Sequence, residues 1–267
     1  MRIRRSCPPA ALALALALAL ALAARPAAAS NPATYKVGNL PVAPGIANVE
    51  VQVAPDWAAQ VGLIALGSGT YTNDNPFAYL SGVGPSAWIH FDGVENLRLS
   101  AAFMEVYYGE VKPLGLPESW EERGILRARF QQPRGAAALY EMVQLDLRNF
   151  TDPTGVHRFV YRPRFRVGQG FNLDAVRIHS LVLFEEVALR FSSDGYAAKA
   201  FESFRALAGY MWTTRRGTFV SLGIVGQISL NPAATRYDVM WGPVLGIEWR
   251  FRSTPPSAPP EPADVEI

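Results

Sequence analysis

The sequence is poor in cysteine: Cys7 is the only one in 267 residues. It lies in an N-terminal stretch, residues 1–29, that has early arginines, an Ala/Leu run and a final Ala-Ala-Ala, which are the features of a cleaved secretory signal. The apolar run, residues 11–24, is shorter than the roughly 20 residues of a membrane-spanning helix, which makes a non-cleaved anchor the less favoured alternative. After cleavage the chain would have no cysteine, which excludes disulfides and thiolate metal sites.

Long hydrophobic runs are also missing after the predicted signal, because no stretch of 18 apolar residues occurs there. This excludes a transmembrane helix. Charged residues make up 18% of the chain, whereas soluble domains have roughly 25%. The formal net charge of +2 gives no nucleic-acid signature, and three scattered histidines give no zinc-ligand spacing. We therefore expect no nucleic-acid partner, no metal and no cofactor.

Sustained helical periodicity is missing too, and about ten segments alternate between apolar and polar residues instead. They are longer than the roughly 5–6 residues of ordinary strands and match the roughly 9–11 of a tilted transmembrane strand. Long connections alternate with tight turns near Asp92, Gln132 and Arg215, as in outer-membrane barrels. Aromatic residues near the segment ends fit the girdles of such barrels: Trp57, Trp88, Tyr107, Tyr108, Trp120, Tyr210, Trp212 and Trp249.

The pattern predicts an all-β protein, an antiparallel transmembrane up-and-down β-barrel of about 10 strands (10–12). The barrel would occupy residues 57–252, after an irregular lead-in over residues 30–56 and before a Pro-rich disordered tail over residues 253–267. We expect localisation in the cell outer membrane, with outer-membrane lipids and the barrel assembly machinery as partners. A soluble periplasmic ligand-binding barrel is the alternative. Pro163 and Pro243, which lack a ladder donor, are expected at bulges.

The most regular segment runs from Val156 to Gly168 and contains an arginine ladder, which we define as Arg158, Arg162, Arg164 and Arg166. A period of two places these guanidinium groups on one face of a strand and the aromatic rings on the other. In a barrel the polar face lines the lumen, and other arginines share this orientation: Arg127, Arg129, Arg148, Arg205 and Arg250. Unpaired charges in a narrow lumen are costly, so carboxylates are expected beside them: Asp146, Glu185, Asp238 and Glu248, with Glu141 as a further candidate.

These arginines have two possible roles, an ion-pair network that fills the lumen or a narrow anion-preferring pore for a small anionic solute. A barrel of about ten strands has little room beyond its own side chains, which favours the ion-pair network. A third hypothesis, a lipid-acting hydrolase, needs a nucleophile and a base on one face. His179 and Ser180 are adjacent in a strand and point to opposite faces. We predict a non-enzymatic envelope barrel with no catalytic residue.

Three segments carry a resemblance to a known family: Tyr161–Gly168, the strand with Glu185 and Glu186, and Phe204–Tyr210. They resemble a family of proteobacterial outer-membrane barrels known only as a domain of unknown function. The likeness covers Trp88–Phe251 and implies a transmembrane β-barrel, without information on chemistry. Members of that family usually end at an aromatic residue, a place that Phe251 takes here before the predicted tail.

Overall fold

The computed structural model describes residues 36–112, 118–174, 178–192, 201–214, 217–230 and 236–251. The predicted signal, residues 1–29, and the predicted tail, residues 253–267, lie outside these ranges. None of the described residues form a helix long and apolar enough to cross a membrane. The strands are β1 (Lys36–Ala54), β2 (Trp57–Ser68), β3 (Tyr79–Val94), β4 (Leu97–Tyr108), β5 (Ser119–Arg134), β6 (Ala137–Thr151), β7 (His157–Asn172), β8 (His179–Leu189), β9 (Phe191–Ser192), β10 (Phe201–Thr213), β11 (Thr218–Leu230) and β12 (Arg236–Phe251).

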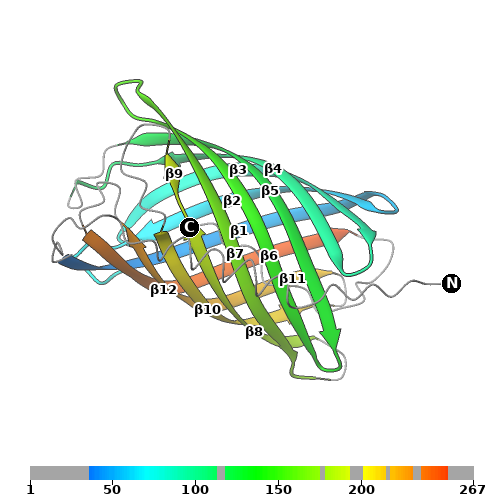
Figure 1. Ribbon diagram of the computed structural model, residues 1–267. Helices are drawn as coiled ribbons and strands as arrows, with labels where there is room; N and C mark the ends of the chain where they lie inside the picture. The colour runs from blue at the N-terminus through cyan, green and yellow to red at the C-terminus, as the bar shows by residue number, and fades with distance from the viewer. Residues whose placement is uncertain are drawn as a thin grey trace, which may run out of the picture. The chain divides into compact units, whose positions relative to one another are not determined.

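These segments close into a barrel of eleven strands (Figure 1). The two-residue β9 continues the line of β8 beyond Arg190 and pairs with the same neighbour, β7. Neighbouring strands are antiparallel except for β1 and β12, which close the barrel as a parallel pair because the number of strands is odd. The predicted all-β barrel is therefore confirmed, with eleven strands in place of ten.

The additional strand is β1, and the prediction of an irregular lead-in over residues 30–56 is wrong for Lys36–Ala54. Two features explain why the sequence pattern did not predict this strand. Pro41 and Pro44 lie in its first half, and its lumen side there is apolar, with Leu40, Val42 and Ile46 all buried. Small or apolar residues therefore occupy both faces, and the polar–apolar alternation that marks the other strands is missing.

The connections differ between the two ends of the barrel. The β1–β2, β3–β4 and β5–β6 hairpins turn over two residues each, at Pro55-Asp56, Glu95-Asn96 and Gly135-Ala136, and we call this end the turn rim. The longer connection over residues 69–78 lies at the opposite end, the loop rim, where β4 ends and β5 begins. The tight turn expected at Asp92-Gly93 is three residues later, at Glu95-Asn96. A shift in register between Phe91 and Val94 puts a bulge there instead.

The parallel closure places the two ends of the sheet at opposite rims. Val42 of β1 pairs with Ser68, the last residue of β2, so that β1 starts at the loop rim. Phe251 of β12 pairs with Val51, close to the β1–β2 turn, so that β12 ends at the turn rim. The first and the last strand therefore run in the same direction along the barrel wall.

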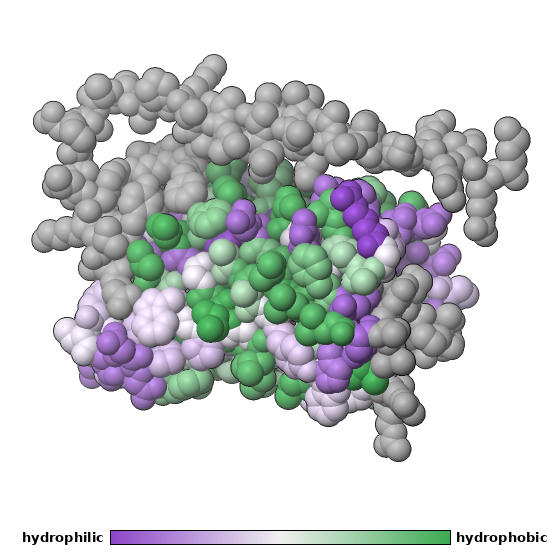
Figure 2. Space-filling model, turned by 90° about the horizontal axis from the view of Figure 1, so that it is seen from below, coloured by the Kyte–Doolittle hydropathy of each residue, from purple (hydrophilic) through white to green (hydrophobic). Residues whose placement is uncertain are grey.

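Successive side chains alternate between the lumen and the outer surface, as the period of two requires. The outer surface is rich in apolar residues, and Leu63, Leu126 and Leu222 are each more than half exposed. Figure 2 shows hydrophobic side chains across the middle of one face and hydrophilic side chains towards its margins. The lumen holds an apolar cluster, contributed chiefly by β1 to β4, beside a charged region on β5 to β8 and β10.

Pro163 and Pro243 lie where pairing with one neighbour is interrupted. Pro163 lies opposite Leu189, in the unpaired stretch of residues 189–190 before β9, and Pro243 faces an unpaired stretch of β1, residues 42–44. The register is the same on both sides of each gap, so no residue is inserted and the expected bulges are not present. Pairing also continues without a shift through the adjacent acids Glu185 and Glu186.

Candidate functional site

Three of the four arginines of the ladder lie inside the barrel. Arg162, Arg164 and Arg166 are 4%, 0% and 2% exposed, because β7 turns its even-numbered residues towards the lumen. Arg158 has the same parity but lies at the loop-rim end of β7, where it is exposed. Among the described residues, eight arginines and six carboxylates are buried, so that the lumen is a charged interior.

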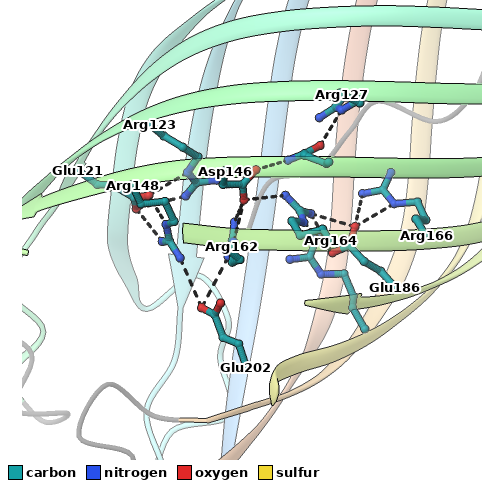
Figure 3. Close-up of polar contacts among 12 residues, drawn as sticks. Glu121, Arg123, Arg127, Asp146, Arg148, Arg162, Arg164, Arg166, Glu186 and Glu202 are labelled. Atoms are coloured by element: carbon teal, nitrogen blue, oxygen red, sulfur yellow. Dashed lines mark hydrogen bonds and ion pairs between the residues drawn. The ribbon is translucent and has the colours of Figure 1, made fainter. Parts of the chain in front are cut away.

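Glu186 of β8 accepts hydrogen bonds from two arginines of the ladder (Figure 3). Arg164 donates from Nη2 to both carboxylate oxygens, at 2.8 and 3.0 Å, and Arg166 donates from Nε and Nη2, at 3.0 and 2.9 Å. Arg205 of β10 adds a third guanidinium at 3.8 Å. One carboxylate thus joins three strands, and its negative charge offsets the positive charges clustered around it.

Asp146 of β6 extends the network towards the loop rim. Arg162 donates from Nε to Asp146 at 2.7 Å, and Nη1 of Arg164 lies 3.6 Å away. The Gln144 amide donates to Asp146 at 2.6 Å and accepts from Arg127 Nε at 2.6 Å. Three of the predicted arginines are therefore brought to the predicted carboxylate Asp146. Arg162 and Arg164 approach it directly, and Arg127 is linked to it by Gln144, which the sequence analysis did not single out.

Glu121 of β5 forms the part of the network nearest the loop rim. It accepts hydrogen bonds from Arg123 Nε at 2.8 Å, Arg148 Nη2 at 2.8 Å and the Tyr108 hydroxyl at 2.7 Å. Arg148 also lies 3.4 Å from Glu202 of β10. The sequence analysis missed Glu121 and Arg123. Both are an even number of residues from Arg127 on β5 and therefore share its inward face.

A second group of charges lies towards the turn rim. Arg98 of β4 donates to both oxygens of Asp92, at 2.7 Å each, and from Nη1 to Glu50 of β1 at 2.9 Å. Arg250 binds Glu248 on the same strand, β12. Of these residues the sequence analysis singled out only Arg250 and Glu248. Glu50 was missed because β1 was not recognised as a strand.

The other charged residues that the sequence analysis singled out lie outside these two groups of ion pairs. The expected partner Glu185 is exposed on the outer face, and its neighbour Glu186 takes the lumen position, because strand parity allows only one of the two inside. Glu141 likewise has outward parity on β6. Asp238 is buried and accepts a hydrogen bond from the Tyr71 hydroxyl at 3.2 Å. Arg129 is partly buried beside Arg127.

Cation–π contacts join the charged region to aromatic side chains of the interior. The Arg127 guanidinium lies 4.3 Å from the centre of the Trp88 ring, and Arg166 lies 4.2 Å from that of Phe184. Trp88 is therefore a lumen residue, and its expected place in an aromatic girdle is wrong. Tyr108 also faces inward. Both orientations follow from the alternation of side chains along the strand. A position near the end of a strand does not by itself show which way the side chain faces.

Each of the three histidines contacts a hydroxyl group, and the exposed His157 Nδ1 at the loop rim lies 3.0 Å from Thr151 Oγ1. His179 contacts the Tyr210 hydroxyl and Ser180 donates to Asn172, on opposite faces of β8 as expected. His90 and Ser100, opposite each other on β3 and β4, do meet, with 2.8 Å between Nδ1 and Oγ. The sequence analysis did not foresee this pair, since it depends on cross-strand register. Both residues are buried in the lumen, where no lipid chain has room.

Charged side chains of the described lumen are closely surrounded by other side chains. Side chains that line a water-filled pore remain accessible to water, whereas Glu50, Asp146 and Arg164 are all 0% exposed. A cavity of about 30 Å³ lies between the two charged groups, lined by Trp88, His90 and Arg98 among others. It has room for a water molecule or an ion of similar size. The arrangement supports a packed ionic interior.

Comparisons with protein-family models and with curated proteins found no match. The resemblance to the family of outer-membrane barrels therefore stays a prediction. Among the described residues, no group of three or more histidine, cysteine, aspartate or glutamate side chains is placed to hold a metal ion.

Proposed function

We propose that the protein is a non-conducting, non-enzymatic outer-membrane barrel whose charged lumen acts as a structural core. One observation carries this proposal: Arg162, Arg164 and Arg166 are buried and bind Asp146 and Glu186. Buried ion pairs of this kind hold adjacent strands in register and leave no open selectivity filter. The protein would serve the envelope as a sealed scaffold in the membrane.

The outer surface supports insertion into a membrane. Exposed leucine, valine and isoleucine side chains occupy the middle of the strands, where the hydrocarbon chains of lipids would contact them. Exposed aromatic residues lie towards the turn rim (Trp57, Trp212 and Trp249) and towards the loop rim (Trp120, Tyr161 and Phe191). Two such belts match the two interfaces of a bilayer. A soluble barrel would leave this surface in water, which favours aggregation.

Single-cysteine variants test the membrane topology. We choose Thr72→Cys at the loop rim, Glu95→Cys at the turn rim and Leu126→Cys in the middle of the outer surface, all exposed positions. In intact cells a membrane-impermeant maleimide is expected to label Thr72→Cys alone, because longer loops face the outside in outer-membrane barrels. After permeabilisation Glu95→Cys is labelled as well, whereas Leu126→Cys stays protected by lipid.

The parent chain, whose only cysteine is Cys7, is the control for background labelling, and urea-unfolded samples show that each cysteine is reactive. Labelling of Leu126→Cys in folded protein, or recovery of the protein in the periplasmic fraction, contradicts a membrane-spanning barrel. Labelling of Glu95→Cys alone in intact cells reverses the orientation but keeps the barrel in the membrane.

A further inference from the structure

One carboxylate lies on the outer surface where the proposed function places lipid. Glu185 is exposed near the middle of β8, and its neighbours across the strands are Val167 of β7 and Ala206 of β10. Val167 and Leu183, which face the same surface, are 37% and 41% exposed. A charged side chain that faces hydrocarbon is costly, so an ionisable residue at such a position indicates a functional contact with a partner.

A second carboxylate, Glu141 of β6, faces the same surface. Glu141 and Glu185 lie opposite Val167 from its two sides, so that one row across β6, β7 and β8 carries both acids. Two strand spacings separate them, which puts their Cα atoms about 10 Å apart. Within the described part of the chain, neither carboxylate makes a hydrogen bond or an ion pair.

The basic residues of this part of the barrel point the other way. On β4 to β8 every arginine has inward parity except Arg134, at the turn-rim end of β5, and these strands contain no lysine. The arginines therefore neutralise carboxylates of the lumen and leave those of the outer surface without a counter-charge. We define the acidic wall as the outward residues Glu141, Val143, Val167, Leu183 and Glu185.

Complementary charge indicates what covers the acidic wall. Lipid chains carry no charge, and lipid head groups lie at the two rims rather than beside the middle of β8. A second copy of the chain, packed through the same surface, would bring its own carboxylates against these two, and like charges repel. An arginine or lysine of another protein supplies both the opposite charge and N–H donors for a carboxylate.

We propose that the acidic wall is an interface for a second membrane-embedded protein, which places an arginine or lysine against Glu185. The inference rests on the proposed function, because it requires this surface to lie within the membrane. Val143, Val167 and Leu183 form the apolar part of the interface, and Glu141 and Glu185 form its charged part. The sealed barrel is then a scaffold for that partner.

Two carbodiimides test the surroundings of Glu185. Dicyclohexylcarbodiimide enters hydrocarbon and is expected to modify Glu185 of the full chain in lipid vesicles, with Glu185→Gln as the control that identifies the labelled peptide by mass spectrometry. In outer membranes of the native cells the partner covers this residue, and the labelling is lost. Equal labelling in both samples overturns the interface alone. Modification in vesicles by a charged, water-soluble carbodiimide overturns the proposed function as well.

Photo-cross-linking in the native cells tests the partner directly. p-Benzoylphenylalanine in place of Val167 is expected to cross-link a membrane protein whose contact peptide contains an arginine or lysine. The same group in place of Leu63, on β2 at the opposite side of the barrel, gives no such adduct.

Charge reversal makes the result specific. Glu185→Lys abolishes the adduct while the folded band in heat-modifiability gels is retained, and a glutamate in place of the partner's basic residue restores the adduct. Adducts with lipid or with a second copy alone, or an adduct that Glu185→Lys leaves unchanged, overturn the proposal.

Discussion

Replacing Glu186 by glutamine lowers the free energy of unfolding by about 3–5 kcal/mol, the cost of removing one partner of a buried ion pair. Glu186 is 2% exposed and binds both Arg164 and Arg166. Glutamine keeps the size of the side chain but removes the charge, so two buried guanidiniums lose their main counter-charge. Urea unfolding of the protein in lipid vesicles, followed by tryptophan fluorescence, measures the change.

The matched control is Glu185→Gln, one residue earlier on the same strand. Glu185 faces outward and is exposed, so this substitution changes the free energy of unfolding by no more than about 0.5 kcal/mol. The same chemical change is thus made on the two faces of β8. Equal effects of the two variants, or a larger effect at Glu185, contradict the assignment of Glu186 to the ionic interior.

Replacing Gly242 by alanine destabilises the seam between β1 and β12 by about 2–4 kcal/mol. Gly242 has a φ of 154°, and a Cβ there would lie 1.8 Å from the Val42 carbonyl oxygen. That contact is with backbone, which cannot move aside as a flexible side chain does. The parallel pair that closes the barrel must therefore separate locally, which is expected to lower the temperature at which the folded band is lost in heat-modifiability gels.

Gly226→Ala on the neighbouring strand β11 is the control for this prediction. A Cβ at Gly226 meets nothing within 4 Å, and the residue faces the exposed outer surface. Alanine there is expected to be neutral, or to stabilise the barrel by less than about 1 kcal/mol through the unfolded state. If both variants lose the folded band at the same temperature as the parent chain, the result contradicts the pairing of β1 with β12.

The fold was predictable where the alternation of residues is strong. In β7 the even positions carry arginine and the odd positions carry apolar residues, so the sequence determines which face is inside. The same reasoning succeeds for Arg127 on β5 and Arg205 on β10, both of which are buried. It fails for β1, in which Leu40 and Val42 give the lumen face the same apolar character as the outer face.

The ion pairs could be predicted only in part, because they depend on register between strands as well as on parity. Arg166 lies directly opposite Glu186, but Arg123 lies opposite Arg148, a like-charge pair that Glu121 bridges. The register between neighbouring strands cannot be derived from a single sequence. Choosing Glu185 over Glu186 was a parity error of one residue, and in a strand such an error reverses the face completely.

The central claim is that the charged lumen is sealed, and single-channel recording in a planar bilayer tests it most directly. The full chain, refolded and shown to be heat-modifiable and to float with liposomes, is added to a bilayer in molar potassium chloride. The account predicts no conductance steps, because Arg164, Glu186 and Asp146 are buried and paired with one another inside the lumen. Steady, reproducible steps with an anion-selective reversal potential would contradict it and make the arginine ladder the filter of a pore.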